Sequence, residues 1–102
     1  MTKVHNKLVR DKIPAIIAGK GGTAITHVLD DDAYLRALIL KLSEECTEFT
    51  DAVTLEELAD VQEVVFALAD VLASRTELEQ TRTAKAELRG AFEARIFLES
   101  TE

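Results

Sequence analysis

The chain has 102 residues, enough for one domain with one hydrophobic core and too few for two independent cores. Its formal net charge of −7 argues against general binding of nucleic-acid polymers, whose phosphates it would repel. Cys46 is the one cysteine, so no intrachain disulfide can form, and no apolar run is long enough to span a bilayer. We therefore expect a single cytoplasmic domain over residues 1–102 that does not enter a membrane.

The first element expected is a short helix over residues 12–18, with Asp11 as its N-cap. The glycine-rich residues 19–22 end it, and they lack the spacing and the preceding strand of a phosphate-binding loop. Residues 23–29 are rich in β-branched side chains, which predicts an extended connector or one edge strand.

Three longer helices follow. The acidic residues 30–32 begin the first, which is predicted to run to about residue 52, and Thr54 begins the second, which ends near residue 73. Ser74 or Thr76 begins the third, which reaches residue 89 and is stopped by Gly90. The chain is thus predicted to be all-α, with a short N-terminal arm.

The short gap between the first two long helices predicts an antiparallel helical hairpin. The second of these helices is apolar on both faces, with Phe66 on the face away from its acidic residues. One chain offers too few helices to cover both faces. We therefore expect a homodimer in which the hairpins form a four-helix-type bundle with Phe66 in or near the interface, or a tetramer made of two such dimers.

Acidic residues interrupt the apolar stripes of both helices. At about 100° per residue, Glu45 and Glu57 fall inside the apolar stripe of their helices, and Glu48 and Asp60 fall about 60° away, one turn further along. The predicted hairpin brings the four carboxylates to one end of its seam, where their mutual repulsion is costly unless a cation binds. An all-oxygen ligand set favours a hard ion, so we predict a Mg²⁺ site, with Mn²⁺ as a substitute.

Each acid also has an ordinary structural interpretation. Glu57 stands three residues after Thr54, as in a capping box, and Glu48 can be a solvated flanking residue. The same placement of acids in two successive helices favours the metal site over these alternatives.

Four segments of the chain resemble a known family. The segments EECTE and EELAD resemble the E-x-x-E and E-x-x-D signature of the all-α nucleoside triphosphate pyrophosphohydrolases, the MazG-like superfamily. The opening NKLVRDKIP and the ending RGAFEARIFLES resemble a narrower group, the phosphoribosyl-ATP pyrophosphohydrolase-like proteins. Ala91 departs from this pattern, because the group usually has a second glycine there.

The resemblance implies Mg²⁺-dependent hydrolysis of a nucleoside triphosphate to the monophosphate and pyrophosphate, with removal of noncanonical nucleotides as its role. It implies that Glu45, Glu48, Glu57 and Asp60 are the metal ligands and catalytic residues. One alternative is hydrolysis of phosphoribosyl-ATP in histidine biosynthesis. Another, of a different class, is a non-catalytic nucleotide-binding or helical dimerisation module.

Basic residues near both ends of the chain are candidates for binding the triphosphate of the substrate. They are Lys7, Arg10 and Lys12 in the N-terminal arm and Lys85, Arg89 and Arg95 near the C-terminus. The alternatives are that they are solvated surface charges, or that Arg10 forms a structural ion pair with Asp11.

Overall fold

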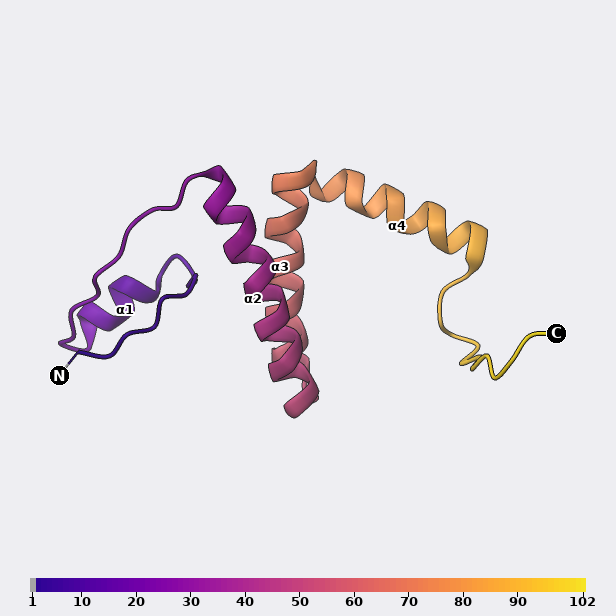
Figure 1. The fold of residues 1–102 in the computed structure, drawn as a ribbon, viewed down its shortest axis with the longest axis horizontal. Coiled ribbons are helices and arrows are strands. Elements are labelled where there is room, and N and C mark those ends of the chain that lie inside the picture. The colour runs from indigo at the N-terminus through magenta and orange to yellow at the C-terminus, as the bar shows by residue number, and fades with distance from the viewer. Residues whose placement is uncertain (1) are drawn as a thin grey trace.

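The structure, a computed structural model, describes residues 2–102 and contains helices as its only regular elements in that range. Figure 1 shows the four helices, which are α1 (Ile13–Gly19), α2 (Asp31–Asp51), α3 (Leu55–Leu72) and α4 (Arg75–Arg89). The all-α prediction is therefore confirmed. Residues 23–29 form a connector without strand pairing.

Side-chain caps begin the three long helices where the sequence predicts them. Each cap accepts a hydrogen bond from the backbone N–H three residues later, at 2.8 Å for Asp30, 3.2 Å for Thr54 and 3.1 Å for Ser74. Ser74, and not Thr76, is therefore the start of α4. Gly90 ends α4 with φ of 83°, a left-handed value that glycine adopts without strain.

The predicted N-cap of the first helix is wrong by one position. Lys12 occupies the cap of α1, and no side chain caps that helix. Asp11 lies instead inside the preceding turn, which the Ile13 N–H closes by donating to the Arg10 carbonyl at 3.1 Å. The turn delays the helix by one residue and moves the Asp11 carboxylate out of reach of the first free N–H groups.

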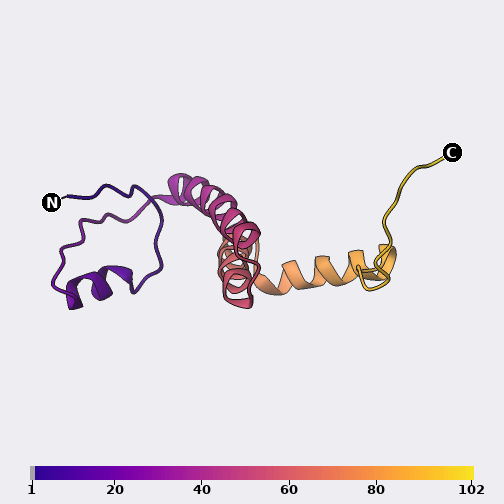
Figure 2. The ribbon, with the colours of Figure 1, turned by 90° about the horizontal axis from the view of Figure 1, so that it is seen from below.

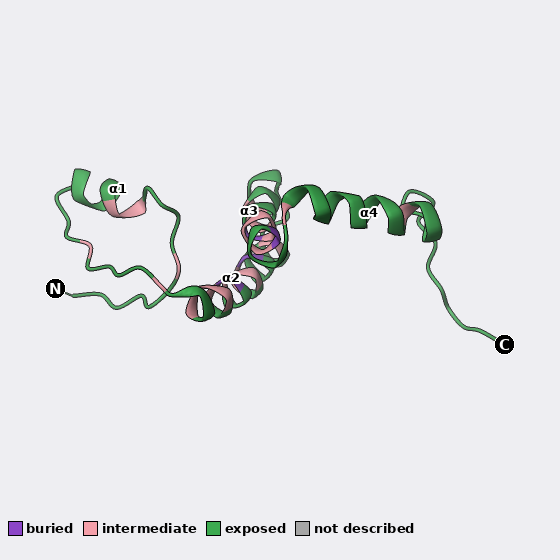
Figure 3. Ribbon diagram, turned by 90° about the horizontal axis from the view of Figure 1, so that it is seen from above, coloured by how far each residue is buried: buried purple, intermediate pink, exposed green. Residues whose placement is uncertain are grey.

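Packing between helices is concentrated where α2 and α3 meet. The chain turns back over residues 52–54, and α3 lies beside α2, whereas α4 extends away from the end of α3 (Figures 1 and 2). Within residues 2–102, α1 packs against no other helix and α4 packs against α3 alone. The buried side chains, Leu38, Glu45, Val64 and Ala69, lie on α2 and α3 (Figure 3).

The chain is extended, and its core is small. Its radius of gyration is 18.0 Å, whereas a compact domain of this length has about 13 Å. Large apolar side chains near the C-terminus are almost fully exposed, with Phe92 at 95% and Phe97 at 87%. One chain alone thus leaves much apolar surface in water.

Phe66 on α3 is half-buried, and one face of its ring is in contact with Arg75 of the same chain. The guanidinium group of Arg75 lies over its ring, 4.7 Å from the ring centroid, a cation–π contact. Its place in a dimer interface stays a prediction. None of the helices described in residues 2–102 has the length and the apolar character required to cross a bilayer.

Candidate metal centre

The second half of α2 and the first turns of α3 bring three of the four predicted acids together. Glu45, Glu57 and Asp60 each offer one carboxylate oxygen, and these three oxygens lie within 4.8 Å of one another. Glu45 is the most buried member, with 7% of the residue exposed, and the other two are half-buried. The helical register that places acids inside the apolar stripes is what turns them toward the α2–α3 contact.

Two oxygens of this group have no hydrogen-bond partner. Glu45 Oε1 faces Lys41 Nζ at 3.2 Å, but Glu45 Oε2 and Glu57 Oε2 are buried and unpartnered. The Thr54 hydroxyl caps α3 by accepting a hydrogen bond from the Glu57 N–H. The Glu57 carboxylate still has its Oε2 without a partner, so this oxygen remains available to a ligand. A buried, unpartnered carboxylate oxygen costs free energy that a bound cation removes.

Glu48, the fourth predicted acid, is exposed and lies outside the group of three. The pKa of its carboxyl is raised chiefly by Glu45, to which the protonated Glu48 carboxyl can donate a hydrogen bond and whose negative charge disfavours ionisation of Glu48, with smaller contributions from Glu57 and Glu44. Glu48 therefore lies at the rim of the same cluster, where a small movement of its side chain would bring it to a cation bound by the other three acids.

Two basic side chains of the N-terminal arm pair with acids at this site. Arg10 Nη2 donates to Asp60 Oδ1 at 2.6 Å, across 50 residues of sequence. The sequence offered an ion pair of Arg10 with Asp11 as an alternative. In the structure Arg10 pairs with Asp60 instead. Lys7 Nζ lies 3.6 Å from Glu44 Oε1, which shows that the N-terminal arm meets the acids at two points.

Lys41 and Glu44 are members of the site that the sequence interpretation missed. Lys41 Nζ lies between two carboxylates, 3.2 Å from Glu45 Oε1 and 3.5 Å from Glu44 Oε1, and its side chain is only 16% exposed. A lysine four residues before a buried glutamate, on the same helical face, is the signal that could have found it.

The charges in this neighbourhood do not balance within the chain. Five carboxylates influence one another here, those of Glu44, Glu45, Glu48, Glu57 and Asp60. Three cations pair with them, Lys7, Arg10 and Lys41, which leaves two negative charges. One divalent cation would neutralise these two remaining negative charges.

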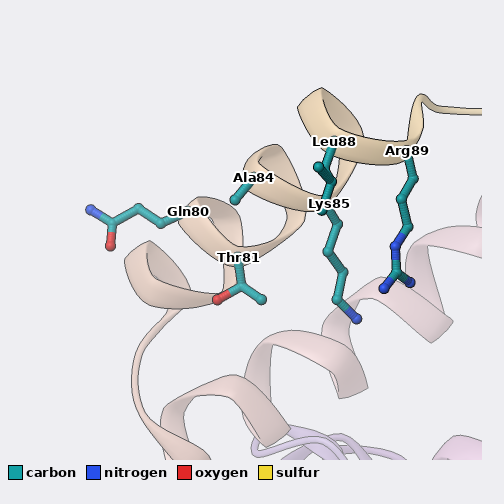
Figure 4. Close-up of a pocket in the computed structure, with 6 residues that line it drawn as sticks. All are labelled: Gln80, Thr81, Ala84, Lys85, Leu88 and Arg89. Atoms are coloured by element: carbon teal, nitrogen blue, oxygen red, sulfur yellow. The ribbon is translucent and has the colours of Figure 1, made fainter.

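The other predicted basic residues lie away from the acids within one chain. Lys12 occupies the N-cap position of α1, Arg95 lies in the C-terminal segment with φ of 58°, and neither forms an ion pair within residues 2–102. Lys85 and Arg89 extend from the same side of α4, which does not touch α2 (Figure 4). They border a shallow depression of about 400 Å³, lined by Gln80, Thr81, Ala84, Lys85, Leu88 and Arg89.

Comparison with known proteins gives one relative and no family. No family model matches the chain, and no solved structure gives a significant match. An uncharacterised protein of Mycolicibacterium smegmatis (strain ATCC 700084 / mc(2)155) is 46% identical over 48 residues. The match covers 47% of this chain and 49% of that protein, so the chain spans about half the length of the relative it matches.

Proposed function

We propose that the protein is a Mg²⁺-dependent nucleoside triphosphate pyrophosphohydrolase that releases the nucleoside monophosphate and pyrophosphate. The observation that carries this proposal is the pair of buried, unpartnered oxygens, Glu45 Oε2 and Glu57 Oε2, beside Asp60. The resemblance of EECTE and EELAD to the MazG-like signature also supports it, because the acids of the cluster are the residues that carry that resemblance.

The residues present fit a hard divalent cation. The donors are all carboxylate oxygens, two of them lack any partner, and the cluster keeps two uncompensated negative charges. Glu45, Glu57 and Asp60 would hold Mg²⁺, with Glu48 completing the set from the rim and Mn²⁺ as a substitute. When bound, the ion supplies positive charge to the phosphoryl oxygens and to the attacking water.

The chain's own side chains prepare the site. Lys41, on the helical turn before Glu45, holds Glu45 Oε1 and leaves Oε2 free for a ligand. The N-terminal arm brings Lys7 and Arg10 to the acids, where they would contact the triphosphate. The experimental signature of this arrangement is loss of turnover, without unfolding, when any of the acids is neutralised.

We further propose that two chains associate as the helical hairpins of a four-helix-type bundle. The small core, the apolar side chains exposed in one chain and the separation of α4 from α2 all support this assembly. In such a dimer Lys85, Arg89 and Arg95 of the second chain would face the acids. Light scattering should give twice the 11.2 kDa of one chain, and a mass of 11.2 kDa would refute the dimer.

The direct test is pyrophosphate release from a panel of nucleoside triphosphates and phosphoribosyl-ATP, with Mg²⁺ and with EDTA. Glu57→Gln should lower turnover by more than about 100-fold, because losing even a partner of a metal ligand costs 10- to 100-fold. Glu56→Gln is the matched control, since Glu56 is the exposed neighbour in the same first turn of α3. It should keep native turnover.

The panel also separates the alternatives. Turnover of phosphoribosyl-ATP far above that of the ordinary triphosphates would identify the protein as the histidine-pathway hydrolase. Binding of a triphosphate without cleavage in Mg²⁺ would identify a nucleotide-binding module and refute the enzyme. Equal loss of folding in Glu57→Gln and in Glu45→Gln, measured by circular dichroism, would show that the acids are structural.

A further inference from the structure

The N-terminal arm reaches the rest of the molecule through the acids of the candidate metal centre. Its ion pairs to α2 and α3 within residues 2–102 are Lys7 with Glu44, at 3.6 Å, and Arg10 with Asp60, at 2.6 Å. The helix that follows the arm, α1, packs against no other helix. The position of the arm therefore depends on the charge state of the cluster that it contacts.

Arg10 and a bound cation compete for the same carboxylate. Asp60 Oδ1 accepts the Arg10 hydrogen bond, and Asp60 is also one of the three acids whose oxygens converge within 4.8 Å. The cluster points to a ligand on a second ground as well, because the Glu45 side chain is only 9% exposed and its Oε2 is unpartnered. Arg10 thus acts as a built-in counter-charge where a cation would bind.

Arg10 is free to leave, whereas Lys41 is not. The Arg10 side chain is 55% exposed and sits on a segment without regular structure. Lys41 is 16% exposed, lies on the same helix as Glu45 and faces two carboxylates. A guanidinium group released beside the acids would meet the phosphates of a bound polyphosphate, which it can grip with two parallel hydrogen bonds.

We propose that Arg10 makes the site selective for a metal–polyphosphate complex over the bare ion. In the metal-free chain Arg10 neutralises Asp60, and when the acids take up a divalent cation Arg10 transfers from Asp60 to a phosphate of the ligand. The bare ion has to displace Arg10 without offering it a new partner, whereas the complex offers one. This inference rests on the proposed function, because it requires the acids to bind a divalent cation.

The test measures binding, not turnover, by calorimetry of the full chain. Arg10→Gln should bind Mn²⁺ alone more tightly by about two- to five-fold, the value of an exposed ion pair. With Mn²⁺ saturating, the same variant should bind inorganic pyrophosphate about tenfold more weakly or worse, because a charge-assisted hydrogen bond is lost. Opposite signs in the two measurements are the signature, since a merely structural residue would weaken both.

Lys3→Gln is the matched control, because it removes an equal charge from the same arm at an exposed residue that forms no ion pair within residues 2–102. It should leave Mn²⁺ affinity within about a factor of two of native, as expected for a screened surface charge. Equal shifts in Arg10→Gln and Lys3→Gln would overturn the inference, as would weaker Mn²⁺ binding by Arg10→Gln.

A third variant separates failure of the inference from failure of the proposed function. Glu45→Gln should abolish Mn²⁺ binding. If the native chain binds Mn²⁺, Glu45→Gln does not and Arg10→Gln behaves as native, the metal centre stands and the role of Arg10 is refuted. If Mn²⁺ binds to none of the proteins, the metal centre and the role of Arg10 are both refuted.

Discussion

Replacing Glu45 by glutamine should stabilise the metal-free protein while removing its response to Mg²⁺. The substitution keeps the size of a residue that is only 7% exposed and removes only its charge. A residue that served the fold alone would have the opposite effect, because its ion pair with Lys41 would be lost. The sign of the stability change therefore tests whether Glu45 is placed for a ligand.

The expected magnitude follows from the distances. At an effective dielectric constant of about 20, Lys41 at 3.2 Å attracts the Glu45 carboxylate by about 5 kcal/mol. Glu57 and Asp60, with oxygens within 4.8 Å, repel it by about 3 kcal/mol or more each. Arg10 screens Asp60, but the amide of glutamine can donate to an unpartnered oxygen, worth about 1 kcal/mol. We expect a net gain of about 1 kcal/mol.

Urea unfolding at pH 7, at one fixed protein concentration, measures this change. In EDTA the midpoint of Glu45→Gln should lie above that of the native chain with an unchanged slope, and added Mg²⁺ should raise the native midpoint alone. Glu63 is an exposed acid of α3 that forms no ion pair within residues 2–102, so Glu63→Gln should shift stability by less than about 0.5 kcal/mol. A destabilised Glu45→Gln, or equal stabilisation of both proteins by Mg²⁺, would refute the reasoning.

Three further outcomes are expected. Leu38→Ala should cost about 2–5 kcal/mol in urea unfolding, because Leu38 on α2 is only 2% exposed, and a loss below about 1 kcal/mol would contradict that burial. The pKa of Glu48 is raised from 4.5 by Glu45, so its contribution to metal-free stability is present below 4.5 and is lost as pH rises through the higher folded pKa. The stability of the native chain relative to Glu48→Gln, measured in EDTA, should therefore fall as pH rises above 4.5, and a flat difference would show that the two carboxyls do not interact. Ser74→Ala removes the cap of α4 and should lower its helicity in circular dichroism, at a cost of about 1 kcal/mol, whereas Thr76→Ala should not.

The parts of the structure that sequence predicted well are those fixed by local chemistry. Asp30, Thr54 and Ser74 are capping residues whose side chains reach a backbone N–H three positions on, so the helix starts follow from residue type and spacing. The convergence of Glu45 and Glu57 follows from helical periodicity, once a short connection turns the second helix back on the first.

The parts that sequence could not predict depend on contacts distant along the chain. Arg10 has no periodic relation to Asp60, because an irregular arm carries it there across 50 residues. The error of one position at Asp11 has a similar origin, since a turn closed by backbone atoms precedes α1 and leaves no mark in side-chain pattern. The course of α4 away from α2 is likewise set by the two-residue connection at Ala73 and Ser74, whose dihedral angles residue type does not determine.

The scarcity of buried apolar side chains has a consequence for how the protein behaves on dilution. Leu38, Val64 and Ala69 are the apolar residues that one chain buries within residues 2–102, too few to offset the conformational entropy lost by about 100 residues. In the proposed dimer, most of the free energy of folding would then come from association. Its unfolding midpoint would rise with protein concentration, and the dimer and the native fold would be lost together as the solution is diluted.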